Sequence, residues 1–64
     1  MIELRKLNDK TFILNCELIE SIEETPDTVI TLTTGKKILV KETVEEIINK
    51  VIAFKNQVFI YRTK

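Results

Sequence analysis

Histidine is absent from this chain of 64 residues, and cysteine occurs once, at Cys16. The chain therefore cannot form a nucleophile activated by histidine or a zinc site built from cysteine and histidine. It also has no second cysteine with which an internal disulfide would form. An enzyme of this composition would have to use carboxylates, lysines or hydroxyls alone. We expect no metal ion or cofactor, and we expect Cys16 to be a small buried residue.

An excess of charge of either sign is also missing, because 10 lysine and arginine residues balance 10 aspartate and glutamate residues. Duplex DNA is bound largely through basic side chains that neutralise phosphates, so a net charge of zero counts against nucleic acid as a partner. No apolar run approaches the roughly 18 residues that cross a membrane, and Glu3 and Arg5 interrupt the apolar start of the chain. We expect a cytoplasmic protein without a signal peptide or a transmembrane segment.

The small size of the chain limits its hydrophobic core. A domain of this length buries only about 60% of the surface that its unfolded chain exposes, and its core rarely supplies more than about 3–5 kcal/mol. Residues 1–64 contain no repeat, linker or low-complexity tract, so we expect a single domain. A small core makes self-association favourable, and we expect a homo-oligomer.

Alternating apolar residues and turn residues predict five short strands. Their expected ranges are residues 2–7, 11–14, 19–24, 28–33 and 36–41. The turns between them are expected at Asn8-Asp9-Lys10, Thr25-Pro26-Asp27 and Thr34-Gly35, and Asn15 is expected to cap a helical turn over residues 16–18. The last three strands form an antiparallel meander, and the N-terminal pair can extend the same curved sheet to five strands.

A change to helical spacing follows the strands. The apolar residues of this stripe are Val44, Ile47, Ile48, Val51 and Ile52. Thr43 and Glu46 fit a capping box at the start of the helix, and Asn56 is a plausible end. Residues 57–62 are compatible with either a strand or a continued helix. The fold class is therefore α+β, with one amphipathic C-terminal helix on a small antiparallel sheet.

Acidic and basic residues are concentrated in different hairpins. Residues 17–28 contain five acids and no base, whereas residues 29–64 contain seven bases and three acids. The acids do not have the spacing of a calcium-binding loop, and a solvated surface explains them without a metal. Lysines around Gly35 lack a phosphate-loop pattern, and edge lysines also protect a strand from aggregation.

Several segments resemble the FlbD/SwrD family of small bacterial flagellar proteins. They are Leu7-Asn8, Phe12-Ile13-Leu14-Asn15, residues 18–32, Gly35-Lys36-Lys37 and Val40-Lys41-Glu42-Thr43. The most specific part is Ile22-Glu23-Glu24-Thr25-Pro26-Asp27-Thr28-Val29-Ile30-Thr31-Leu32 followed by Gly35-Lys36-Lys37. The chain departs from the family pattern at Asp9, Cys16 and Thr43, where Gly, Pro and Ser are usual. The resemblance implies a non-enzymatic accessory that supports motor power in swarming, with a flagellar stator or motor protein as its partner.

Two surfaces are candidate contact sites. The first is an acidic hairpin turn at Glu23, Glu24, Pro26 and Asp27, which could bind a basic cytoplasmic loop of a partner protein. Electrostatic attraction would determine how fast the two proteins meet and how they are oriented, more than how tightly they bind. The candidate partner-binding residues also include Lys36 and Lys37 of the basic hairpin. The candidate oligomer interface is the apolar tail, Val58, Phe59, Ile60 and Tyr61.

Two other functions remain open from the sequence. Residues 29–37, followed by a capped helix, also resemble the core of LytTR-type DNA-binding domains, which makes a small DNA-binding or regulatory module the alternative. The zero net charge stands against it. A purely structural homo-oligomer is the third possibility.

Overall fold

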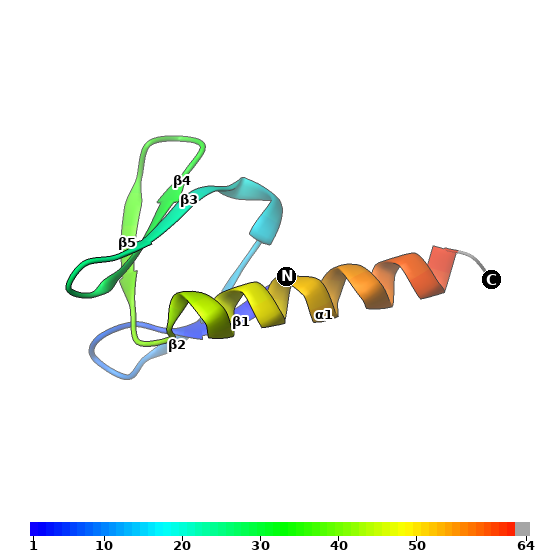
Figure 1. Cartoon of the computed structure of the whole chain (residues 1–64), viewed down its shortest axis with the longest axis horizontal. Helices are drawn as coiled ribbons and strands as arrows, with labels where there is room; N and C mark the ends of the chain where they lie inside the picture. The colour runs from blue at the N-terminus through cyan, green and yellow to red at the C-terminus, as the bar shows by residue number, and fades with distance from the viewer. Residues whose placement is uncertain (63–64) are drawn as a thin grey trace.

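The computed structural model describes the backbone of residues 1–62 and the side chains of residues 1–56. Its elements, in chain order, are β1 (Ile2–Arg5), β2 (Thr11–Leu14), the 3₁₀ turn η1 (Cys16–Leu18), β3 (Ile19–Glu24), β4 (Thr28–Leu32), β5 (Lys37–Val40) and α1 (Val44–Arg62) (Figure 1). The expected α+β class is confirmed, with five antiparallel strands and one C-terminal helix.

The five strands are divided between two sheets, so the expected extension of one sheet to five strands is wrong. β1 and β2 form a hairpin, and β3, β4 and β5 form the expected meander. An isolated bridge between Lys6 and Val40 joins the two sheets, and Lys41 N donates to Arg5 O at 2.8 Å beside it. The chain reverses directly after Lys6, where Asp9 N donates to Lys6 O at 2.9 Å, so the bridge does not grow into a longer ladder.

The turns follow the predicted chemistry. Asp9 and Gly35 adopt positive φ angles of 70° and 92°, which an aspartate tolerates and a glycine adopts freely. Asn8 Oδ1 accepts from Lys10 N at 3.0 Å in the first turn. Asn15 Oδ1 accepts from Glu17 N at 3.0 Å and caps η1, as expected.

Helix α1 begins with the predicted capping box. Glu46 N donates to Thr43 Oγ1 at 3.1 Å, and Thr43 N donates to Glu46 Oε1 at 2.9 Å. The helix then continues to Arg62, so an end at Asn56 is wrong, and so is the strand alternative for residues 57–62. No glycine or proline follows Asn56 to interrupt the helical backbone.

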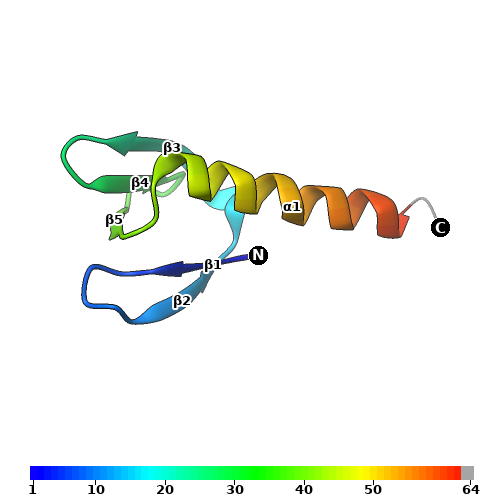
Figure 2. The ribbon, with the colours of Figure 1, turned by 60° about the horizontal axis from the view of Figure 1, so that its bottom comes forward.

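The core lies where the helix meets both sheets. Leu4, Ile30, Val40 and Ile47 are its fully buried large side chains, and Cys16 is buried beside them as expected. Helix α1 packs on β1 and β3, and Ile47 is its one buried residue among those whose side chains the structure describes. Figures 1 and 2 show the second half of α1 extending beyond the strands, which makes the molecule elongated, at 41 × 23 × 18 Å.

Candidate functional site

The N-terminal hairpin is tied to the start of α1 by a buried carboxylate. Glu42 is 4% exposed, and its two oxygens accept from Arg5 N at 2.9 Å and from Arg5 Nε at 3.1 Å. Burial raises the pKa of Glu42, but hydrogen bonds from Arg5 and from its own backbone outweigh burial, and the pKa is lowered. The carboxylate is thus held ionised as a structural group.

A second ion pair joins the same regions at the surface. Lys41 Nζ contacts Asp9 Oδ1, and both side chains are partly open to solvent. The hydrogen bond and positive charge of Lys41 lower the pKa of Asp9. Together with the Glu42 contacts, this pair positions the β1–β2 turn beside the segment that leads into α1.

The predicted acidic residues gather at the turn between β3 and β4. Glu23, Glu24, Pro26 and Asp27 are all exposed there, and the Thr25–Pro26 peptide bond is cis. Glu23 lies opposite Val29 in the sheet register, so it is held by strand pairing directly before the turn. The structure therefore places Glu23, Glu24, Pro26 and Asp27 on one projecting turn, which we call the acidic tip.

Glu24 has a structural contact that sequence reasoning missed. Its Oε1 accepts from Val44 N at 2.8 Å, which satisfies a free amide at the start of α1. A carboxylate at this end of a helix also interacts favourably with the helix dipole. The two residues are separated by 20 positions, and no local motif signals such a contact.

Lys36 and Lys37 do not join the acidic tip. They follow Gly35 in the turn between β4 and β5, which lies at the other end of the antiparallel meander (Figure 1). Both are exposed, and Lys37 lies opposite Thr31 in the sheet. The predicted partner-binding residues thus form two separate surfaces of opposite charge.

The side chains of the predicted oligomer residues Val58, Phe59, Ile60 and Tyr61 lie outside the described part of the chain. Their backbone is helical, as part of α1. Because this segment is helical, its residues return to the same face every 3.6 residues and do not alternate between two faces as they would in a strand.

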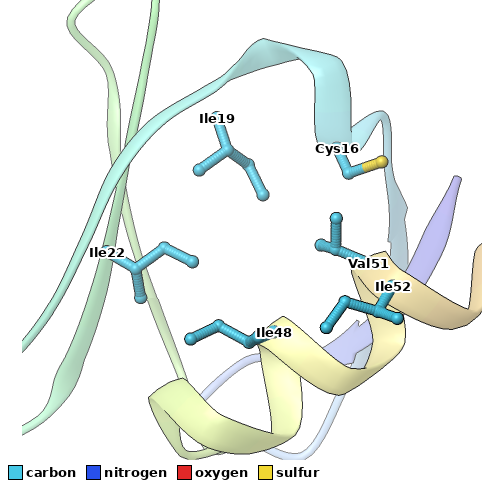
Figure 3. A pocket seen from close by; sticks show the side chains of 6 residues that line it. All are labelled: Cys16, Ile19, Ile22, Ile48, Val51 and Ile52. Carbon is cyan, nitrogen blue, oxygen red and sulfur yellow. The ribbon is translucent and has the colours of Figure 1, made fainter. Parts of the chain in front are cut away.

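An apolar hollow of about 240 Å³ lies between α1 and the segment formed by η1 and β3 (Figure 3). The side chains that line it are Cys16, Ile19, Ile22, Ile48, Val51 and Ile52. Lys55 Nζ lies 3.5 Å from Glu17 Oε1 and links the helix to η1 near this hollow. The hollow is open to solvent because the two small sheets do not cover the full apolar face of the helix.

Two residues of the predicted apolar stripe remain at the surface. Ile48 and Ile52 are 46% and 51% exposed, whereas Ile47 is fully buried. The sequence pattern indicated this exposure, because a helix stripe of five aliphatic residues is wider than the contact area that a small sheet can cover. We therefore regard the hollow and its two exposed isoleucines as a further candidate contact surface.

A polar hollow of about 260 Å³ lies on the other side of the helix start. It is lined by Glu3, Arg5, Thr11, Glu42, Glu46 and Lys50. Arg5 and Glu42 are bound to each other, and Glu46 Oε1 accepts from Thr43 N in the capping box. Arg5, Glu42 and Glu46 thus already make structural contacts within the fold.

The described residues hold no group of three or more cysteine, aspartate or glutamate side chains arranged to bind a metal ion. In the same part of the chain, no helix is long and apolar enough to cross a membrane. The described part of the chain exposes an acidic tip, a basic turn and an apolar hollow.

Comparison with known protein families identifies a match. A sequence model of the family described as "FlbD: Flagellar and Swarming motility proteins" matches residues 1–59. No curated protein and no solved structure matches the chain. The matched region includes all five strands and most of α1.

Proposed function

Because this chain belongs to the FlbD family of flagellar and swarming motility proteins, we propose that it is a non-enzymatic accessory of the flagellar motor. It supports motor power during swarming by binding a stator or another motor protein. It acts in the cytoplasm, peripherally at the motor. The family match over residues 1–59 favours this function over the DNA-binding alternative.

The acidic tip is the contact that we assign to a basic cytoplasmic loop of the partner. The observation that carries this assignment is the exposure of Glu23, Pro26 and Asp27 on one projecting turn, in a segment with no basic residue. In the described part of the chain, Glu23 and Asp27 form no ion pair, so their charges are available to a partner. Complementary charge at such a surface speeds encounter and orients the partner.

Contacts within the fold hold the acidic tip in place. Glu24 holds the end of β3 to the start of α1 through Val44 N, so the turn is anchored to the helix as well as to β4. A rigid contact loses less conformational entropy on binding than a flexible loop would. Lys36 and Lys37, at the other end of the meander, provide a second contact of opposite charge.

The test is motor torque in a motile host that carries the chromosomal change Glu23→Gln with Asp27→Asn. We expect lower torque and weaker copurification of the partner. Glu24 is left unchanged because it caps α1. The matched control is Glu3→Gln with Glu20→Gln, which removes the same charge from two exposed positions away from the turn. Unchanged torque and copurification in a folded Glu23/Asp27 variant would refute the assignment.

A further inference from the structure

We propose that the exposed face of α1 beside the apolar hollow is a self-association surface, on which a second copy of this chain packs its own α1 in the antiparallel direction. This dimer goes beyond the motor accessory function and does not depend on it. It also does not rest on the side chains of the apolar tail.

Apolar exposure gives the first argument. Ile48 and Ile52 are about half exposed at the edge of the hollow, where Figure 3 shows them together with Ile22 and Cys16 around one space. An engineered apolar cavity of about 150 Å³ in another protein binds benzene, so a hollow of 240 Å³ has room for aliphatic side chains. Covering these groups removes apolar surface from water and favours association.

The charges that flank the isoleucines give the second argument. Glu45, Ile48, Ile52 and Lys55 are separated by three, four and three residues, which places them on one stripe of the helix. All four are exposed. The stripe therefore reads acid, isoleucine, isoleucine and base from its N-terminal to its C-terminal end.

This order is complementary to itself only when the second helix runs in the opposite direction. In an antiparallel pair centred between the isoleucines, Glu45 lies opposite Lys55 of the second copy, and Ile48 lies opposite Ile52. A parallel pair would place Glu45 against Glu45 and Lys55 against Lys55. Charge complementarity thus selects both the occupant and its direction, and produces a two-fold dimer, the commonest symmetry of soluble oligomers.

The intrachain contact of Lys55 is compatible with this arrangement. Lys55 Nζ lies 3.5 Å from Glu17 Oε1, and the two side chains remain 58% and 64% exposed. An ammonium group has three donors, so Lys55 can interact with Glu17 of its own chain and with Glu45 of the second copy. The dimer would also place a second helix over the open side of the hollow.

Sedimentation equilibrium of the purified full chain, from low micromolar to submillimolar concentration, tests the proposal. We expect a monomer–dimer equilibrium. Ile52→Glu should raise the dissociation constant by roughly tenfold or more, because it places a charge at the centre of the contact. Ile13→Glu is the matched control, since Ile13 is 64% exposed on β2 and lies outside the hollow. It should leave the dissociation constant unchanged.

Charge reversal tests the antiparallel direction. Glu45→Lys or Lys55→Glu alone places like charges opposite each other, and each variant should dimerise more weakly than the wild type. An equimolar mixture of the two variants restores both opposite-charge pairs and should form a heterodimer. Circular dichroism confirms that each variant is folded. A wild type that stays monomeric at every concentration would overturn the proposal, and a different protein would then be the candidate occupant of the hollow. A dimer that Ile52→Glu and both charge reversals leave intact would also overturn it.

Discussion

Glu42 binds Arg5 through both of its carboxylate oxygens, across 37 residues of chain. One oxygen accepts from the backbone amide of Arg5 and the other from its guanidinium group. Glu42 therefore holds both the backbone of β1 and the Arg5 side chain in place. Glu42 also precedes the capping residue Thr43 directly. This buried side chain therefore holds the N-terminal hairpin to the start of α1, together with the Lys6–Val40 bridge and the Lys41–Asp9 ion pair.

Acid should weaken the fold through Glu42. Its pKa in the folded chain is below the ordinary value of 4.5, because the Arg5 hydrogen bonds outweigh burial. The unfolded state then binds the proton more readily, so Glu42 stabilises the fold above its unfolded pKa and loses this contribution as pH falls through its folded pKa. Urea unfolding measured from neutral pH to about pH 3 should show this loss.

The control for this pH dependence is Glu42→Gln, whose amide does not titrate. The variant should be less stable than the wild type at neutral pH, by about 1–3 kcal/mol, because the charged acceptor is lost from a buried site. Its stability should fall less steeply below pH 4.5. Parallel pH curves for the two proteins would contradict the role of Glu42.

Removal of the Glu24 carboxylate should destabilise the start of α1. Glu24→Ala leaves Val44 N without its acceptor and removes a favourable charge at the helix start, and we expect a loss of about 0.5–1 kcal/mol. Glu23→Ala is the control, because Glu23 precedes the same turn and makes no such contact in the described residues. Equal stability of the two variants in thermal unfolding would argue against the cap.

Glycine at position 35 should be required for its backbone angle alone. Its φ of 92° is unfavourable for residues with a Cβ atom, although no atom lies within 4 Å of the place that a Cβ would take. Gly35→Ala should therefore cost about 1 kcal/mol through backbone strain, and Gly35→Asn should cost less. Chemical denaturation measures both. A neutral Gly35→Ala substitution would mean that the turn relaxes to another conformation.

Sequence patterns predicted the features that depend on neighbouring residues. The Asn15 cap, the Thr43 and Glu46 capping box, and the turns at Asn8-Asp9-Lys10 and Thr34-Gly35 all arise within a few residues of the chain. The arrangement of the strands in two sheets depends instead on how distant segments meet, because Lys6 and Val40 form only an isolated bridge and not a continuous ladder. The helix end was missed because continued helical spacing outweighs a single asparagine.

The candidate site was likewise predictable from the sequence only where it depends on neighbouring residues. Charge and turn residues located Glu23 and Asp27 on one exposed tip. Local patterns did not reveal that Glu24 also holds the helix, because that contact spans 20 residues. The exposure of Ile48 and Ile52 depends on how much of α1 the two small sheets cover, which periodicity alone does not specify.

The most direct test of the proposed function is crosslinking from the acidic tip in a motile host. A photoreactive amino acid replaces Thr25, which is exposed at the turn, and in a second strain it replaces the exposed Ile13 of β2 as a control. Both strains must swarm normally. Mass spectrometry should identify a flagellar stator or motor protein joined through position 25 and absent from the position 13 sample. A position 25 product that contains no flagellar protein would contradict the account.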